Sequence, residues 1–418
     1  MKLTPTKYVI QRHVYIAICS EEQHNKESTV NITILGGGIG GLSTAIALKQ
    51  NGFDVTVYER APQPSNIGAG IVCWPNASFV LEQLGLLEAV ANVSGSINYM
   101  NRYTDTGQPI GSLNINELNK LMNYKSYSIL RKDLLRILLE RTVTLNIDIH
   151  YDHEVTNITE GTLDSVIYFR NGERISPDLI IGADGRMRSV ARKYVNGNNQ
   201  PIYQGFINWV GVYEHPSSDF ADLTISDYWG QGTRFGIVPI SKTKAYWAGG
   251  TLCEKVGLKE PKYYKSELNA LFSSWPEPIP RIINQSHTPA INKIYVHDHD
   301  PIATWHRNNV VLLGDAAHSP LPTSGQGACQ ALEDAWHLSN CLKNSDGNLS
   351  YAINTFTELR KTKTSGITMT GRQLASSIFN RDSVFCRQRN LASKQTNYSE
   401  AVFNMAKGWS SGLPLPLG

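Results

Sequence analysis

The stretch VNITILGGGIGGLSTAIALKQNGFDVTVYER, residues 30–60, decides the fold of this chain. Its first apolar residues predict a short buried strand that ends at a glycine-rich turn. Gly36, Gly38 and Gly41 form the pattern G-x-G-x-x-G, and the residues that follow predict a helix ending at Gly52. Glycine lets the backbone turn sharply and approach a pyrophosphate, whose charge meets the N–H groups at the start of the helix.

A second strand, DVTVYE, ends at Glu59, which lies 59 − 41 = 18 residues beyond Gly41. In a dinucleotide-binding unit an acidic residue at about this distance meets a ribose 2′-hydroxyl. A lone glycine pattern is weak evidence, but strand, helix, strand and acid in this order predict a dinucleotide site. These residues leave open whether the dinucleotide is NAD or FAD.

Two later segments also place an Asp at the end of an apolar strand. LIIGADG, residues 179–185, contains Asp184, and VVLLGDAAHSPLPTSGQGACQALEDA, residues 310–335, contains Asp315. A single Asp of this kind is usually a helix cap or a turn residue. Because the carboxyl ends of parallel strands converge on one crevice, three such turns predict one shared site in an α/β fold.

The composition is that of an ordinary soluble protein. The 418 residues are 41% hydrophobic and 18% charged, and the formal net charge of +3 is too small to suggest a nucleic acid or an anionic membrane as partner. The six cysteines are scattered, without a C-x-x-C pair, so we expect reduced thiols in the cytoplasm and no metal site. Apolar runs all fall short of the roughly 18 residues of a membrane span. We interpret residues 1–29 as a disordered extension outside the fold.

The three segments together resemble, in order, the three fingerprints of the FAD-dependent aromatic hydroxylases, which are single-component flavoprotein monooxygenases. The resemblance implies a Rossmann-type FAD-binding domain, an inserted substrate domain with a mixed β-sheet, and C-terminal helices. On this basis we assign residues 30–100, 125–192 and 305–345 to the FAD-binding domain, 101–124 and 193–304 to the substrate domain, and 346–418 to a C-terminal helical segment.

The resemblance also implies roles for individual residues. Glu59 would bind the adenosine ribose, Arg131 would reach the ribityl or pyrophosphate region of the flavin, and Asp315 would hydrogen-bond the ribityl chain. For Arg131 the simpler alternative is a surface arginine at a helix start.

The loop after Asp315 is expected to pass the flavin ring. Pro322 would stiffen it, and Gly325, Gln326 and Gly327 would begin a helix facing the pyrimidine edge. The positive end of that helix, roughly half an elementary charge, would stabilise negative charge on the reduced ring.

The chain departs from the family pattern at two places. In DGRMRSVAR the residues Ser189 and Arg192 lie one position later than usual, so we assign Asp184 to the cofactor site but not Ser189. Cys329 stands where the family usually has Asn, which removes a side-chain amide from that position.

Residues 193–304 are rich in short alternating strands, which predicts a sheet over the flavin. YQGFINWVGVY, GTRFGIVPISKTKAYW and IYVHDHDPI are similar to segments of the FAD-dependent urate hydroxylases. This similarity implies that Arg234, Tyr246 and Asp298 line the substrate pocket. Arg offers a planar fork to ring carbonyls and Asp accepts from ring N–H groups. An ion pair between Arg234 and Asp298, and plain strand packing of Tyr246, are the structural alternatives.

The activity implied is hydroxylation of a small electron-rich ring anion through a flavin C4a-hydroperoxide, with O2 as cosubstrate and NADH or NADPH as electron donor. Urate, converted to 5-hydroxyisourate, is the favoured substrate. The alternatives are a hydroxylase of a phenolic acid such as salicylate or 3-hydroxybenzoate, a nicotinamide-dependent dehydrogenase without flavin, and a flavin-binding sensor. We expect a monomer or homodimer.

Overall fold

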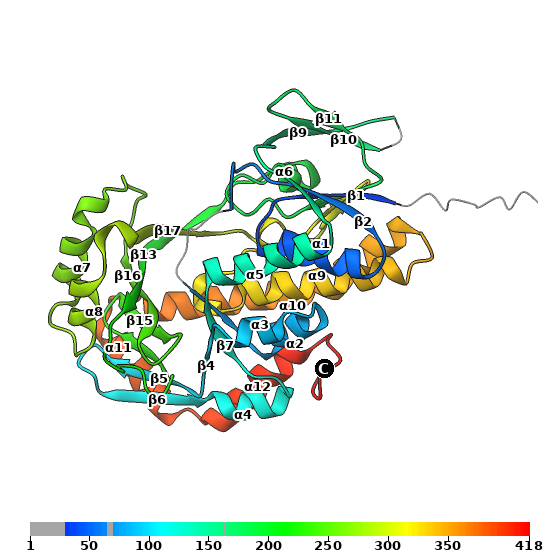
Figure 1. The fold of residues 1–418 in the computed structure, drawn as a ribbon. Helices are drawn as coiled ribbons and strands as arrows, with labels where there is room; N and C mark the ends of the chain where they lie inside the picture. The colour runs from blue at the N-terminus through cyan, green and yellow to red at the C-terminus, as the bar shows by residue number, and fades with distance from the viewer. Residues whose placement is uncertain (1–29, 65–69, 163) are drawn as a thin grey trace, which may run out of the picture.

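The computed structural model of the chain describes residues 30–64, 70–162 and 164–418, so the expected extension at residues 1–29 lies outside the described part. The predicted α/β fold is confirmed. Its first layer is a six-stranded sheet (Figure 1). The spatial order is β18 (His306–Arg307), β19 (Val310–Leu312), β12 (Leu179–Gly182), β1 (Asn31–Leu35), β2 (Asp54–Tyr58) and β8 (Asp148–His150). All neighbours are parallel except the edge strand β18, and the central strands are buried on both faces, as parallel strands between helices are.

The register of this sheet brings the predicted turns together. Leu35 pairs with Gly182 on one side and with Tyr58 on the other, and Gly182 also pairs with Leu312. The residues that follow these four strand ends therefore emerge at one edge of the sheet, where the glycine turn, Glu59, Asp184 and Asp315 all lie.

Three helices pack together beside the sheet. The first is α1 (Ile39–Gln50), which contacts both α5 (Arg131–Thr144) and α9 (Gly327–Lys343). Residues of α1 are buried on every side, and several of them are Gly, Ser, Thr or Ala, whose small side chains allow close packing. In a small antiparallel sheet of β9 (Val155–Glu160), β10 (Ser165–Phe169) and β11 (Arg174–Ile175), a turn with Gly172 at positive φ joins β10 to β11.

A second large sheet forms the other end of the molecule (Figure 1). Its seven strands are β17 (Asn292–Asp298), β13 (Ile202–Glu214), β16 (Lys244–Leu252), β15 (Thr233–Pro239), β14 (Ile225–Trp229), β5 (Tyr99–Thr104) and β6 (Pro109–Asn114). The pairing is antiparallel except between β14 and β5, which are parallel, so the expected mixed sheet is confirmed.

The two faces of this sheet differ. Phe235, Ile237 and Trp247 lie on the outer face and pack with α7 (Tyr264–Phe272) and α8 (Ile279–Gln285) into a separate hydrophobic core. The opposite face, here called the inner face, carries Arg234 and Tyr246, because successive residues of a strand point to opposite sides. A three-stranded sheet of β3 (Gly70–Cys73), β7 (Tyr127–Leu130) and β4 (Gly95–Ser96) lies on that side, since a Cβ built on Gly70 would overlap the Tyr246 ring.

The C-terminal residues form the expected helices α10 (Leu349–Ile378), α11 (Ser383–Gln395) and α12 (Tyr398–Ser410). Helix α10 links the two large sheets: Thr357 hydrogen-bonds His306 of β18, and Phe379, just past its end, stacks on Phe206 of β13 with ring centroids 4.2 Å apart. Within the described residues, no helix has both the length and the apolar character that are needed to cross a membrane.

Candidate active site

The glycine turn adopts a backbone that only glycine tolerates well. Gly36 has a φ of +112°, and a Cβ built there would lie 2.3 Å from the carbonyl oxygen of Ala183. A Cβ on Gly41 would lie 1.9 Å from the carbonyl oxygen of Gly36. Gly38 is the N-cap of α1, and a Cβ there would meet no atom within 4 Å. The start of α1 is therefore open, free of side chains, and able to receive an anion.

The carboxylate of Glu59 accepts hydrogen bonds from the backbone of the glycine turn and of Ala61. Its Oε2 accepts a hydrogen bond from the Gly37 N–H at 2.7 Å, and its Oε1 accepts one from the Ala61 N–H at 2.8 Å. Each carboxylate oxygen can accept a second bond, so these contacts leave capacity for ribose hydroxyls. A contact from Glu59 to a ribose stays a prediction.

Substituting Gly38 with Ala tests whether the open end of α1 binds a dinucleotide. The backbone at Gly38 (φ −83°, ψ −175°) accepts any residue, so we expect the apoprotein to fold normally. The added methyl would project where the pyrophosphate approaches, and the FAD Kd should rise roughly tenfold, about 1.4 kcal/mol. Flavin fluorescence titration measures this, with Gly366→Ala on α10, also in open space, as the matched control. Equal FAD affinity in both variants would contradict the assignment.

Arg131 and Asp315 face the same region from different elements. Arg131 begins α5, where burial lowers its pKa and the negative charge of Asp315 opposes that shift, so the two groups are close. Asp315 lies in the 3-10 helix η3 (Gly314–Ala316) and is 45% exposed, and Nη1 of Arg186 is 4.0 Å from its Oδ2. A solvent-accessible carboxylate between two guanidinium groups can accept hydrogen bonds from sugar hydroxyls.

Asp184 has a different set of contacts. Its Oδ1 accepts from the Ser189 hydroxyl at 2.5 Å, and its Oδ2 accepts from the N–H groups of Val190 and Ala191 at 2.7 and 3.2 Å. The carboxylate thus accepts from the first two N–H groups of α6 (Val190–Asn196), whose N-cap residue is Ser189. A contact from Asp184 to a cofactor stays a prediction.

The loop between Asp315 and α9 is fixed by its own backbone. Pro322 begins the 3-10 helix η4 (Pro322–Ser324), and Gly325 follows with a φ of +63°. The indole N–H of Trp74 donates to the Gly325 carbonyl at 2.9 Å. Gln326 is the N-cap of α9 and Gly327 its first residue, so the predicted helix start is present.

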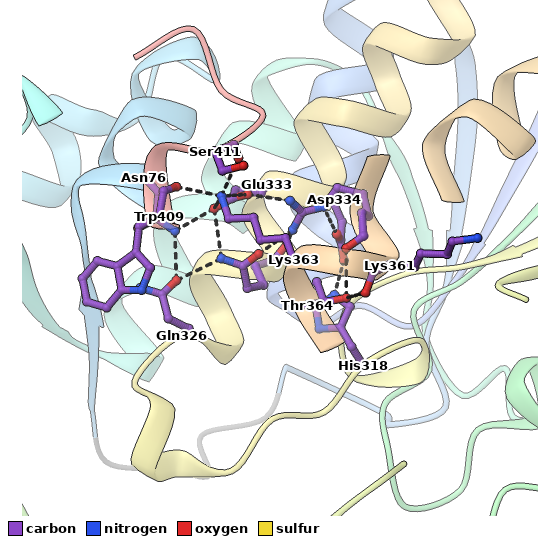
Figure 2. A network of polar contacts seen from close by, with 12 residues as sticks. Asn76, His318, Gln326, Glu333, Asp334, Lys361, Lys363, Thr364, Trp409 and Ser411 are labelled. Carbon is purple, nitrogen blue, oxygen red and sulfur yellow. Dashed lines mark hydrogen bonds and ion pairs between the residues drawn. The ribbon is translucent and has the colours of Figure 1, made fainter. Parts of the chain in front are cut away.

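A buried polar network clamps both ends of this loop (Figure 2). At one end, Oε1 of Gln326 accepts hydrogen bonds from the amides of Asn76 and Gln330 at 2.9 and 3.0 Å. At the other end, Oδ2 of Asp334 accepts from the Gly314 N–H at 2.8 Å, directly before Asp315. The side chain of Gln326 is therefore engaged with the protein interior.

The network is charged at its centre. Arg360 of α10 is fully buried and donates to Glu333 at 2.6 Å and to Asp334 at 2.7 Å. Lys363 donates to Glu333 at 2.9 Å and to the carbonyls of Trp409 and Ser411, which attaches the C-terminal segment (Figure 2). Burial alone would raise the pKa of Asp334, but its interactions with His318 and Arg360 outweigh burial and lower that pKa below its ordinary value.

On the inner face of the seven-stranded sheet, Arg234 and Tyr246 flank a floor of small residues. Gly236 of β15 pairs with Ala248 of β16, and Arg234 and Tyr246 lie on either side of this pair. Burial raises the pKa of Tyr246, while the nearby charge of Arg234 only partly opposes the shift, so the phenol is protonated at neutral pH and can donate. Tyr246 is close to Cys329 as well, which places it near the first turn of α9.

Arg234 does not pair with Asp298. Its Nε and Nη2 donate instead to the two carboxylate oxygens of Asp227, at 2.6 and 3.2 Å. The alternative of an ion pair between Arg234 and Asp298 is therefore wrong.

Asp298 is fully buried and paired elsewhere. Arg372 of α10 donates to it through Nε at 2.6 Å and through Nη2 at 3.0 Å, and Gln204 donates at 2.7 Å. In the described part of the chain, no hydrogen bond or ion pair joins Asp298 to Arg234 or Tyr246. The structure thus brings two of the three predicted pocket residues together on the inner face and anchors the third to α10.

Comparison with known proteins identifies the family. Residues 29–345 match the family model described as an FAD binding domain. The aurachin C monooxygenase/isomerase of Stigmatella aurantiaca is 34% identical over 75% of this chain and 80% of its own length. The chain belongs to this family of FAD-dependent monooxygenases.

Two further comparisons concern urate. The monooxygenase is 30% identical to an FAD-dependent urate hydroxylase of Mycolicibacterium vanbaalenii, over 82% of this chain and 87% of the relative. It is also similar to the crystal structure of Klebsiella pneumoniae HpxO complexed with FAD and uric acid, with a TM-score of 0.85 and 26% identity, over 93% of this chain and 98% of that one.

The residues of the monooxygenase fit FAD. The space beside Gly38, at the start of α1, can receive a pyrophosphate, and each carboxylate oxygen of Glu59 can still accept a hydrogen bond from a ribose hydroxyl. Asp315 is an accessible acceptor near the guanidinium groups of Arg186 and Arg131. Membership of the FAD binding domain family removes the alternative of a dehydrogenase without flavin.

Sequence reasoning missed three residues that contact the predicted pocket residues of the monooxygenase: Asp227, Gln204 and Arg372. Asp227 could have been found, because ISDYW alternates and places an Asp on an otherwise apolar face, where it requires a cation. Arg372 gave no such signal, since it lies 74 residues from Asp298 on a helix with many polar residues.

Proposed function

We propose that this monooxygenase hydroxylates a small electron-rich ring, and that urate, converted to 5-hydroxyisourate, is its substrate. The observation that carries the proposal is the inner face of the sheet, where Arg234 and protonated Tyr246 offer donors on either side of the Gly236–Ala248 floor. Urate carries several carbonyl oxygens that such donors match.

The protein's own part is to bind and orient the ring. Arg234 would donate to a carbonyl through Nη1, the nitrogen that Asp227 leaves free, and Tyr246 would donate to a second oxygen near the start of α9. Asp298 is fully buried and held by Arg372 and Gln204, so a hydrogen bond from a ring N–H to Asp298 stays a proposal. Bound FAD supplies the oxygen activation. The start of α9 would favour negative charge on the reduced ring.

We further propose that NADH or NADPH is the electron donor and O2 the cosubstrate. A donor of this kind would dock transiently, since the sequence contains a single G-x-G-x-x-G pattern and FAD accounts for it.

One observation favours a second candidate substrate, an uncharged aromatic ring. The charge of Arg234 is compensated by Asp227 and that of Asp298 by Arg372, so an uncharged aromatic ring would also fit. The match to the aurachin C monooxygenase/isomerase is consistent with substrates other than urate.

Turnover with urate tests the proposal. NADH or NADPH oxidation by the FAD-loaded protein is followed together with the loss of urate absorbance. We expect urate to accelerate nicotinamide oxidation and to disappear in equal amount. Acceleration with intact urate and with hydrogen peroxide formed would make urate an effector only, and no response would exclude urate both as substrate and as effector.

A further inference from the structure

A row of directly paired residues crosses the inner face of the seven-stranded sheet. Arg102 of β5 pairs with Asp227 of β14, Asp227 pairs with Gly236 of β15, and Gly236 pairs with Ala248 of β16. Directly paired residues project to the same side of a sheet. The Asp227 carboxylate and the Arg102 side chain therefore share a face with the proposed substrate floor.

The space beside Asp227 is open at Gly236. A Cβ built on Gly236 would have Oδ1 of Asp227 at 3.8 Å and the carbonyl oxygen of Ala248 at 4.0 Å as its nearest neighbours. Both distances are ordinary van der Waals contacts or longer, so a side chain would fit where glycine leaves room. A substrate ring on this floor would lie beside the carboxylate.

Asp227 is 3% exposed and all its contacts are with donors. Its Oδ1 accepts from Nε of Arg234 at 2.6 Å, and its Oδ2 accepts from Nη2 of Arg234 at 3.2 Å and from the indole N–H of Trp229 at 2.8 Å. This bidentate pairing fixes the guanidinium plane and occupies one of its two forked edges. It also offsets the charge, so Arg234 meets the substrate as part of a neutral pair.

Arg102 adds a cation whose charge is not paired. Its guanidinium carbon lies 5.0 Å from the centroid of the Trp229 ring, and its buried Nε has no hydrogen-bond partner. Among the described residues, Arg102 takes part in no ion pair. Arg389 of α11 lies over the same ring, with its guanidinium carbon 5.4 Å from the centroid, and it also feels the charge of Asp227. Without that charge, the guanidinium groups of Arg234, Arg102 and Arg389 would have one carboxylate fewer beside them.

We infer that Asp227 is a specificity-determining residue, which orients Arg234 and cancels its charge so that the pocket selects a neutral hydrogen-bonding ring edge over a carboxylate. A carboxylate concentrates its charge on two oxygens and gains most from a full positive charge, whereas a ring carbonyl needs only an oriented donor. Asp227 thereby disfavours aromatic acids, the main alternative to urate. The inference rests on the proposed function only in taking the inner face as the substrate site.

Calorimetric titration of the FAD-loaded protein with salicylate and with salicylamide tests the inference. These ligands have nearly the same shape and differ in charge. We expect the wild type to bind salicylamide at least as tightly as salicylate. In Asp227→Asn, salicylate affinity should rise at least about fivefold, while salicylamide affinity should stay within twofold. Glu214→Gln, which removes the charge of an acid paired with Lys244 in the same sheet, should change neither value.

Three results would overturn the inference. They are a salicylate affinity that Asp227→Asn leaves unchanged, equal changes for both ligands, and a wild type that binds salicylate about tenfold more tightly than salicylamide or binds neither. The last criterion needs no variant, so it decides the question even if Asp227→Asn does not fold. Absence of urate turnover with the amide preference intact would overturn the proposed substrate and leave the inference standing.

Discussion

Replacing Arg234 with Met should lower kcat/KM for urate at least about 30-fold, because the substrate carbonyl loses a hydrogen bond from a charged donor, which is worth about 1.5–3 kcal/mol. The variant loses the donor to the ring, and among the described residues it leaves the Trp229 N–H as the hydrogen-bond donor to Asp227. Steady-state kinetics with urate measure the loss, and the flavin spectrum checks that FAD remains bound. Adding Asp227→Asn to the same chain should restore part of the activity, since the uncompensated charge is then gone.

Arg387 on α11 provides the matched control for this prediction. It is exposed, so Arg387→Met removes the same side chain without touching the inner face, and kcat/KM should be unchanged. A wild-type kcat/KM in Arg234→Met would remove Arg234 from the proposed site.

Replacing Arg360 with Met should lower the free energy of unfolding by about 3–5 kcal/mol, the usual cost of removing one partner from a buried ion pair. Glu333 and Asp334 would be left buried, with Lys363 beside Glu333 and the His318 imidazole hydrogen-bonded to Asp334. Because Asp334 holds the Gly314 N–H and Glu333 holds Asn76, the loop at Asp315 and Gln326 should also loosen, and the FAD Kd should rise. Urea unfolding and flavin titration measure the two effects.

The pKa values of the network predict how the stability loss of Arg360→Met depends on pH. In the wild type the pKa values of Glu333 and Asp334 are lowered, since Arg360, Lys363 and His318 outweigh the effect of burial. Their contribution to stability is therefore fully present above about pH 4–5 and is lost as the pH falls through the lowered pKa values. The deficit of Arg360→Met should be largest near neutral pH and smaller in acid. Lys361→Met, in an exposed ion pair on α10, should lower the free energy of unfolding by less than about 1 kcal/mol at any pH.

The elements that surround the cofactor site could be predicted because their signals are local. The strand before Gly36, the glycine turn and the strand ending at Glu59 follow one another within 30 residues, and parallel register then fixes where their ends meet. The loop at Gly325 and the helix that starts at Gly327 could be predicted for the same reason, since proline fixes φ and glycine permits positive φ wherever they occur.

The pairings inside the site could not be predicted in the same way. Arg234 and Asp298 both carry charge in a strand, but which partner each takes depends on register and on helix α10, far away in the sequence. The burial of Arg360 could not be predicted for the same reason. The sequence of α10 predicts a polar helix on the surface, and Arg360 is buried because it packs on the carboxylates of Glu333 and Asp334 of α9.

The most direct test of the account is the origin of the oxygen atom in the product. The FAD-loaded protein is supplied with NADH or NADPH and urate under ¹⁸O2, and the product is analysed by mass spectrometry before it can exchange oxygen with water. Hydroxylation by a flavin monooxygenase predicts that each product molecule contains one ¹⁸O atom. An unlabelled product, or hydrogen peroxide as the sole fate of the labelled oxygen, would contradict hydroxylation of urate by this monooxygenase.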